Sequence, residues 1–311
     1  MDRMSCSFVP KKDGRVGLLY LLNEQGMVKS EATVANLPAS DRGPERMWYG
    51  SAAASEYHDM DWLCAHMRAD EDVQIRSLTN DMTILVLAGP DARAVLQACA
   101  RGDWSNDAFP FLQVRECEIG FAAATVMRVS FSGELAYEIH VANASLYAAY
   151  LALRAAGENF DLRLFGARAV ESMRMEKGFL HWKADLITEF DPYETGLTRF
   201  VRIDKGPFVG REALRERLTK APRKQFVTLH VKTDHAPAHA GASLMEAGRV
   251  VGTITSGAWG YRTQKNLAYA FVETDFANVG ATMSLDLCGD LIEAEVIAPG
   301  AFDPEHKRMR E

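Results

Sequence analysis

The sequence predicts an α+β fold of antiparallel sheets covered by helices, followed by a small C-terminal β-barrel. Two observations support this. Between residues 16 and 177, pairs of strand-like segments are followed by helix-like segments, which is typical of helices layered on antiparallel sheets. From Gln225 onward, short alternating strands follow one another closely across tight turns, which is typical of a small barrel. We therefore expect two domains, residues 1–220 and residues 221–311.

Composition limits the kinds of partner. The chain has 311 residues, 48% of them hydrophobic, and a net charge of −7, so it can bury sizeable cores and offers no general surface for nucleic acid. Its five cysteines lack a CxxC pair, which favours reduced thiols in a cytoplasmic protein over a metal site or disulfide framework. No apolar run reaches the roughly 18 residues that span a bilayer, so we expect no membrane partner.

The first predicted elements form a hairpin that leads into a helical region. One strand ends at a turn over residues 23–26, and a second strand runs from Val28 to Leu37. A short strand around Met47 then enters a helix, with Ser51 or Ser55 available as its cap.

The next segments repeat this order. Residues 73–89 predict a hairpin around residues 79–81, and a helix follows from Pro90 to Ala100. Residues 128–141, RVSFSGELAYEIHV, alternate apolar and polar side chains on both sides of a Ser-Gly-Glu turn and predict a bent hairpin. Helices are then expected over residues 144–156 and 166–175.

Glu138 lies in the apolar second strand of that bent hairpin. Desolvating a lone carboxylate costs several kcal/mol, so its side chain either points to water or meets a hydrogen-bond donor. The residues alone leave both alternatives open.

Four stretches in order carry a resemblance: GELAYEIHV, GARAVESMRMEKG, DPYETGLTRFVRIDKGPFVGREAL and VGTITSGAWGY. Together they resemble the folate-binding aminomethyltransferase family, which includes the T protein of the glycine cleavage system and the C-terminal regions of dimethylglycine and sarcosine dehydrogenases. HDMDWL and the HW..DL run favour the dehydrogenase branch. The resemblance covers nearly the whole chain. It implies tetrahydrofolate as cofactor and transfer of an aminomethyl or methyl unit from a methylated amine or similar donor.

The resemblance also implies a catalytic carboxylate. The family places an aspartate eight residues after an Asn or Thr, and the residue eight positions after Asn23 is Glu31, one methylene longer. A tyrosine of the family is replaced by Leu18, but Tyr20 lies on the same strand face two residues later. The alternative is that Glu31 is a surface residue of an edge hairpin.

The implied cofactor-binding residues are Tyr49, Ser51, Glu138, Tyr20 and Trp259. The resemblance places Tyr49 and Ser51 on a strand that contacts the pterin partly through its backbone. Tyr49 could instead anchor a strand end, and Trp259 could instead cover a core. An arginine of T proteins is replaced by Val170, so its role is not carried over.

The resemblance predicts a partner and leaves a second function open. Full-length relatives begin with a strand-helix layer that this chain lacks, so we expect an exposed apolar face near residues 8–22 and 84–88, covered by a homo-oligomer or a partner subunit. No GxGxxG loop occurs, so flavin-dependent amine oxidation would need a separate flavoprotein subunit. The chain could then be a non-catalytic relative, or the folate domain of a split dimethylglycine or sarcosine dehydrogenase.

Overall fold

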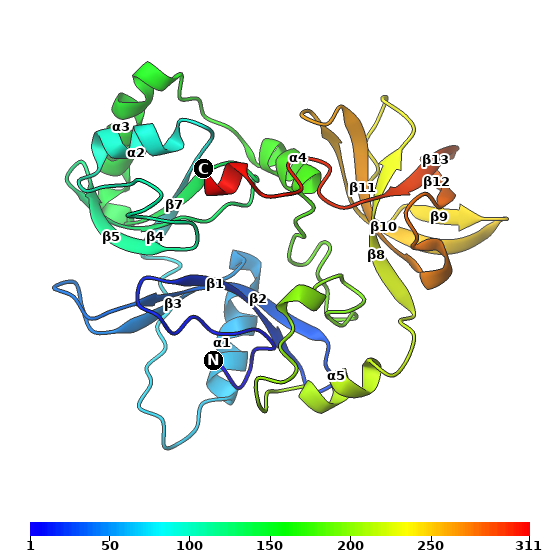
Figure 1. Cartoon of the computed structure of the whole chain (residues 1–311), viewed down its shortest axis with the longest axis horizontal. Coiled ribbons are helices and arrows are strands. Elements are labelled where there is room, and N and C mark those ends of the chain that lie inside the picture. The colour runs from blue at the N-terminus through cyan, green and yellow to red at the C-terminus, as the bar shows by residue number, and fades with distance from the viewer.

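The computed structural model describes residues 1–311 and confirms the predicted fold class. It contains a three-stranded antiparallel sheet, a four-stranded antiparallel sheet and a closed six-stranded barrel. Figure 1 shows these three bodies around a common centre, with helix α4 (Ala167–Lys177) between the four-stranded sheet and the barrel. No helix has the length and apolar character needed to cross a membrane.

The first sheet has the order β1 (Val16–Leu22), β2 (Val28–Leu37) and β3 (Arg46–Gly50). Its β1–β2 hairpin confirms the prediction because the turn is locally determined. The Asn23 side-chain oxygen accepts hydrogen bonds from the backbone N–H of Gln25 and Met27, and Gly26 takes a positive φ of 78°. Helix α1 (Glu56–Ala65) follows β3, as expected.

The prediction of an exposed apolar face near residues 8–22 is wrong for strand β1. Leu19, Leu21 and Leu22 are fully buried. The outer edge of β1 is covered by the chain's own first residues, since the Cys6 N–H donates to the Tyr20 carbonyl at 3.0 Å. Phe8, nearby, is 63% exposed.

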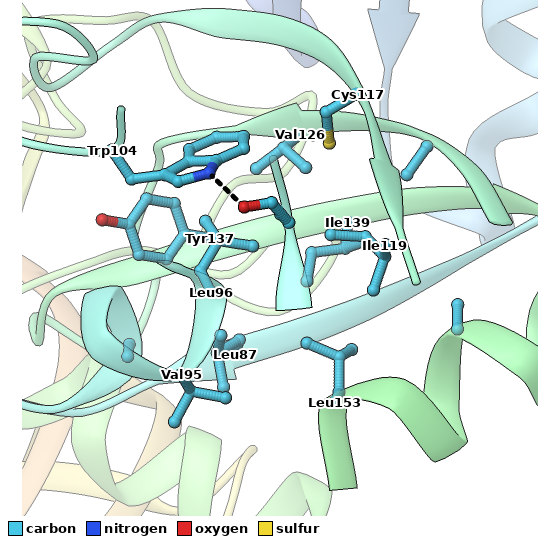
Figure 2. Packing of buried hydrophobic residues seen from close by; sticks show 14 of the residues in the cluster. Leu87, Val95, Leu96, Trp104, Cys117, Ile119, Val126, Tyr137, Ile139 and Leu153 are labelled. Atoms are coloured by element: carbon cyan, nitrogen blue, oxygen red, sulfur yellow. Dashed lines mark hydrogen bonds between the residues drawn. The ribbon is translucent and has the colours of Figure 1, made fainter. Parts of the chain in front are cut away.

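The second sheet has the order β4-β7-β6-β5. Its strands are β4 (Met82–Ala88), β5 (Val114–Ile119), β6 (Ala122–Met127) and β7 (Ala136–Ala142). Helices α2 (Ala92–Cys99) and α3 (Leu146–Gly157) cover one face, as their apolar stripes predict. Figure 2 shows this core, in which Leu96 and Leu153 reach from the two helices toward the sheet.

Two local predictions in this region are corrected. Residues 73–78 are not a strand, because β4 pairs with β7, far along the chain, and leaves them without a partner. Residues 128–135 form a loop between β6 and β7 rather than a continuous hairpin arm. The antiparallel pairing on either side of that loop is as predicted.

The barrel follows α5 (Arg211–Arg217) and closes in the order β10-β11-β8-β13-β12-β9. Its strands are β8 (Lys224–Val231), β9 (Ser243–Glu246), β10 (Arg249–Gly260), β11 (Lys265–Glu273), β12 (Thr282–Leu287) and β13 (Asp290–Ile297). The turn at Ala247 and Gly248 has positive φ at both residues, which suits a tight hairpin.

Helix α4 joins the barrel to the second sheet. It packs against β10 and β11, and Glu176 on α4 accepts hydrogen bonds from Arg262 and Thr263 in the β10–β11 turn. Arg262 also pairs with Glu134 in the loop that precedes β7. The C-terminal segment, red in Figure 1, crosses from the barrel toward the second sheet, and Asp303 pairs with Lys177 on the way. The second sheet, α4 and the barrel are therefore held together by charged contacts as well as by apolar packing.

Gly210, just before α5, tests whether the chain there packs closely against the hairpin that carries Glu31. It has a φ of +78°, and a Cβ there would lie 2.3 Å from the Asn23 carbonyl oxygen. We expect Gly210→Ala to lower the free energy of unfolding by about 3 kcal/mol, from left-handed backbone strain together with the clash. Gly196 is the matched control, because its φ is +71° and nothing lies within 4 Å of its Cβ position. Gly196→Ala should cost only about 1 kcal/mol. Equal losses in urea unfolding would contradict this description.

Candidate active site

The candidate site lies where the first two sheets face each other. Ala35 and Leu37 of β2 pack against Val114 and Met127 of the second sheet. Side chains alternate along a strand, so Glu31 is on the same face of β2 as Ala35. Met127 is paired with Glu138 across β6 and β7, so Glu138 faces the first sheet. The two predicted carboxylates therefore rise from facing surfaces.

Glu31 is partly buried and directly opposite Tyr20 in the β1–β2 register. Burial raises the pKa of Glu31 to about 7; the polar Tyr20 hydroxyl opposite it lowers the pKa, and the negative charge of Asp185 adds to the rise. Burial and Glu31 itself raise the pKa of Tyr20 far above its usual value, so its hydroxyl stays a donor. The register of the β1–β2 hairpin thus places Tyr20, rather than Leu18, opposite Glu31.

Asp185 lies in a fully buried polar cluster beside Glu31. Its carboxylate pairs with Arg174 of α4 and accepts hydrogen bonds from the Ser256 hydroxyl at 2.8 Å and the His181 backbone N–H at 2.9 Å. Thr255 donates to the same carboxylate. Because the four donors come from three separate segments, this charge is held in place next to Glu31.

Glu138 lies in a mainly apolar setting. Its side chain is 31% exposed. The same face of neighbouring β4 presents Ile84 and Val86, which are 48% and 51% exposed and are paired with His140 and Glu138. Trp48 of β3 lies edge-on to the His140 ring, with centroids 5.4 Å apart. A partly exposed carboxylate beside exposed apolar side chains is suited to a flat ligand with N–H groups along one edge.

The remaining expected residues are not brought together with Glu31. The Tyr49 side chain lies on the opposite face of the first sheet, where it interacts with Ser30 and Asp59. Ser51 directly follows β3 and is partly buried. Trp259 is paired with Asn266 in the barrel, and alternation along β10 directs its ring away from Ala258, which packs on α4. Ligand contact by Tyr49 would therefore involve its backbone.

Sequence reasoning missed four groups at the site. Trp48 precedes Tyr49 on β3, so its side chain points to the opposite face of the strand. Once Tyr49 is known to face away from the second sheet, Trp48 must face toward it. His140 lies two residues from Glu138 and so shares its face. Asp185 is part of the HW..DL run, but no local signal pairs it with Arg174. Helix α4 carries two arginines, and the structure shows that Arg174 is the buried one.

The comparisons with known proteins assign the family. Residues 1–205 match the model of the GCVT N-terminal domain, and residues 224–303 match the glycine cleavage T-protein C-terminal barrel domain. The chain belongs to this family of glycine cleavage T-protein-like domains.

Its relatives include dehydrogenases and aminomethyltransferases. It is 32% identical to mitochondrial dimethylglycine dehydrogenase of Mus musculus over 312 residues, covering 100% of this chain but 35% of that protein. The chain thus spans about a third of the length of the dehydrogenases it matches. It is 26% identical to an aminomethyltransferase of Symbiobacterium thermophilum, covering 95% of this chain and 78% of that protein. The crystal structure of aminomethyltransferase T from Bartonella henselae superposes with a TM-score of 0.82 at 25% identity, covering 94% and 77% of the two chains.

The raised pKa of Glu31 predicts a pH-dependent effect on stability. Between about pH 4.5 and 7 the folded chain holds a proton on Glu31 that the unfolded chain has lost, so this residue lowers stability as pH rises through that window. Glu31→Gln removes the titration and keeps the shape. We expect its free energy of unfolding to equal the parent's near pH 4 and to exceed it by roughly 3 kcal/mol at pH 8.

Urea unfolding of both proteins at pH 4, 6 and 8 measures this difference. A constant difference between mutant and parent across the range would show that Glu31 titrates normally.

Proposed function

We propose that this chain is a tetrahydrofolate-dependent transferase that moves an aminomethyl or methyl unit from a methylated amine or similar donor. The observation that carries the proposal is the placement of two partly buried carboxylates, Glu31 and Glu138, on facing sheets, with exposed apolar side chains beside Glu138. Family membership supports the same class of reaction.

Glu138 fits the polar edge of a pterin. Its two carboxylate oxygens offer acceptors to two neighbouring N–H groups, the arrangement that gives strong charge-assisted hydrogen bonds. Ile84 and Val86 supply apolar contacts for the ring beside it. In this proposal Glu138 binds and orients the cofactor, and its negative charge does no chemistry.

Glu31 is proposed to act at the reacting end. Tetrahydrofolate supplies a nucleophilic ring nitrogen that accepts the one-carbon unit. With a pKa of about 7, Glu31 can hold or release a proton at its carboxylate at neutral pH, as a general acid or base requires. Tyr20 orients that carboxylate, and Asp185 favours its protonated form. The extra methylene relative to an aspartate changes its reach, which matters where placement within about an ångström affects rate.

A flavoprotein partner is part of the proposal. The dehydrogenases that this chain matches are about three times its length, so the oxidation of a methylated amine would be carried out by protein outside the matched region. Phe8, outside the proposed ligand site, is an exposed apolar side chain available for such a subunit or for a homo-oligomer. We propose a reducing, cytoplasmic location because all five cysteines are unpaired.

A second candidate is a folate-binding domain without transferase activity of its own. The raised pKa of Glu31 favours this candidate. A carboxylate that is partly protonated at neutral pH provides less negative charge at the reacting end than an ionised aspartate. Turnover of dimethylglycine or sarcosine with tetrahydrofolate, with and without an amine-oxidising flavoprotein, separates the two candidates. Binding of tetrahydrofolate without turnover in either condition would support the second.

Glu138→Gln tests the proposed pterin contact. The change replaces one acceptor by a donor, so tetrahydrofolate binding should weaken by about 2–4 kcal/mol in calorimetry. Stability should change little, because the side chain is half-exposed. Glu118→Gln is the matched control, an exposed glutamate on β5 of the same sheet. Unchanged affinity in Glu138→Gln would remove this residue from the site.

Glu31→Gln should lower turnover more than it lowers tetrahydrofolate affinity, because a group that acts in the transition state contributes little to ground-state binding. Glu31→Asp restores the residue of the family pattern. We expect its activity to exceed that of Glu31→Gln, and a value above the parent's would show that the longer side chain limits the rate. Steady-state kinetics with equal activity for parent and Glu31→Gln would show that Glu31 has no part in the reaction.

A further inference from the structure

His140 is a buried side chain with an unused polar atom beside Glu138. Its residue is 3% exposed, and its Nε2 is buried without a hydrogen-bond partner. Nε2 lies 3.5 Å from Oε2 of Glu138, which is an ion-pair distance rather than a formed hydrogen bond. A buried polar atom without a partner lowers stability, so its presence calls for an explanation.

The surroundings of His140 direct it toward Glu138. His140 and Glu138 are two residues apart on β7, so their side chains share one face. The strand neighbours of His140 are Ile84 on β4 and Thr125 on β6, and Trp48 packs edge-on against its ring. Trp48 restricts the ring from the side of the first sheet, and the ring nitrogen is left facing the Glu138 carboxylate.

We propose that His140 is a positioning residue, whose Nε2–H donates to Oε2 of Glu138 when a ligand with paired N–H groups engages that carboxylate. This inference rests on the proposed function, because it takes tetrahydrofolate as the ligand of Glu138. A carboxylate has about four lone-pair sites, so two ligand N–H groups and one imidazole N–H can be accepted together. The donation fixes the plane of the carboxylate, which otherwise rotates freely at a half-exposed position.

The proposal explains the unpaired nitrogen as a site prepared for the bound state. In the free protein Nε2 is buried, 3.5 Å from Oε2 of Glu138, and makes no hydrogen bond, which costs stability. In the complex the same atom completes the hydrogen bonds of the carboxylate. Function and stability therefore make opposite demands on this residue, and that opposition distinguishes a positioning role from a packing role.

The test measures tetrahydrofolate affinity by anaerobic calorimetry, and unfolding free energy without ligand, for three variants. His140→Phe keeps a ring and removes the donor. We expect it to bind tetrahydrofolate at least tenfold more weakly, while its stability is equal to the parent's or higher. His140→Gln supplies an amide N–H of similar reach and should recover most of the affinity. His230→Phe, on the barrel strand β8, is the control and should bind as the parent does.

A double-mutant cycle shows whether the effect passes through Glu138. When Glu138→Gln is already present, His140→Phe should cost less than threefold in affinity, because an amide oxygen accepts more weakly than a carboxylate. Equal losses in both backgrounds, or a less stable His140→Phe protein, would assign His140 to packing and overturn the inference. A parent that binds no tetrahydrofolate overturns the proposed function and this inference together. Binding that Glu138→Gln weakens and His140→Phe leaves intact overturns this inference alone.

Discussion

The buried carboxylate of Asp185 is the constraint on which the site depends. A charge removed from water is tolerated only when several donors surround it, and Asp185 has donors from three separate segments. Arg174 comes from α4, Ser256 from the barrel, and His181 from the chain between them. Helix and barrel must both be in place for this carboxylate to be buried, so it couples their positions. Its negative charge also helps to raise the pKa of Glu31 on the first sheet.

The two proposed functional carboxylates differ because their surroundings differ. Glu31 is partly buried and lies near Asp185, and its pKa rises to about 7. Glu138 is half-exposed and has a histidine as its polar neighbour. One group is thus suited to proton transfer and the other to accepting hydrogen bonds from a ligand. The separation of acid-base behaviour by environment is a general way to obtain two roles from one kind of side chain.

Sequence reasoning succeeded where structure is local. The Asn23 turn determines the first hairpin, and the strand period places Tyr20 on the same face as Leu18. It failed where the partner is distant. Nothing near residues 73–78 reveals that β4 pairs with β7, and nothing near Tyr49 reveals that its neighbour Trp48 faces the second sheet. The pairing of Arg174 with Asp185 is likewise a product of tertiary packing, so the resemblance located the site's segments but not its internal contacts.

The central claim is that a pterin binds between the facing surfaces of the first two sheets, with Glu138 at its polar edge and Glu31 at its reacting nitrogen. A crystal structure of the complex with tetrahydrofolate is the most direct measurement. The account predicts that both oxygens of Glu138 lie within hydrogen-bond distance of pterin N–H groups, and that the Glu31 carboxylate lies beside the ring nitrogen that accepts the one-carbon unit. A pterin bound elsewhere, or bound here with Glu31 turned away toward solvent, would contradict it.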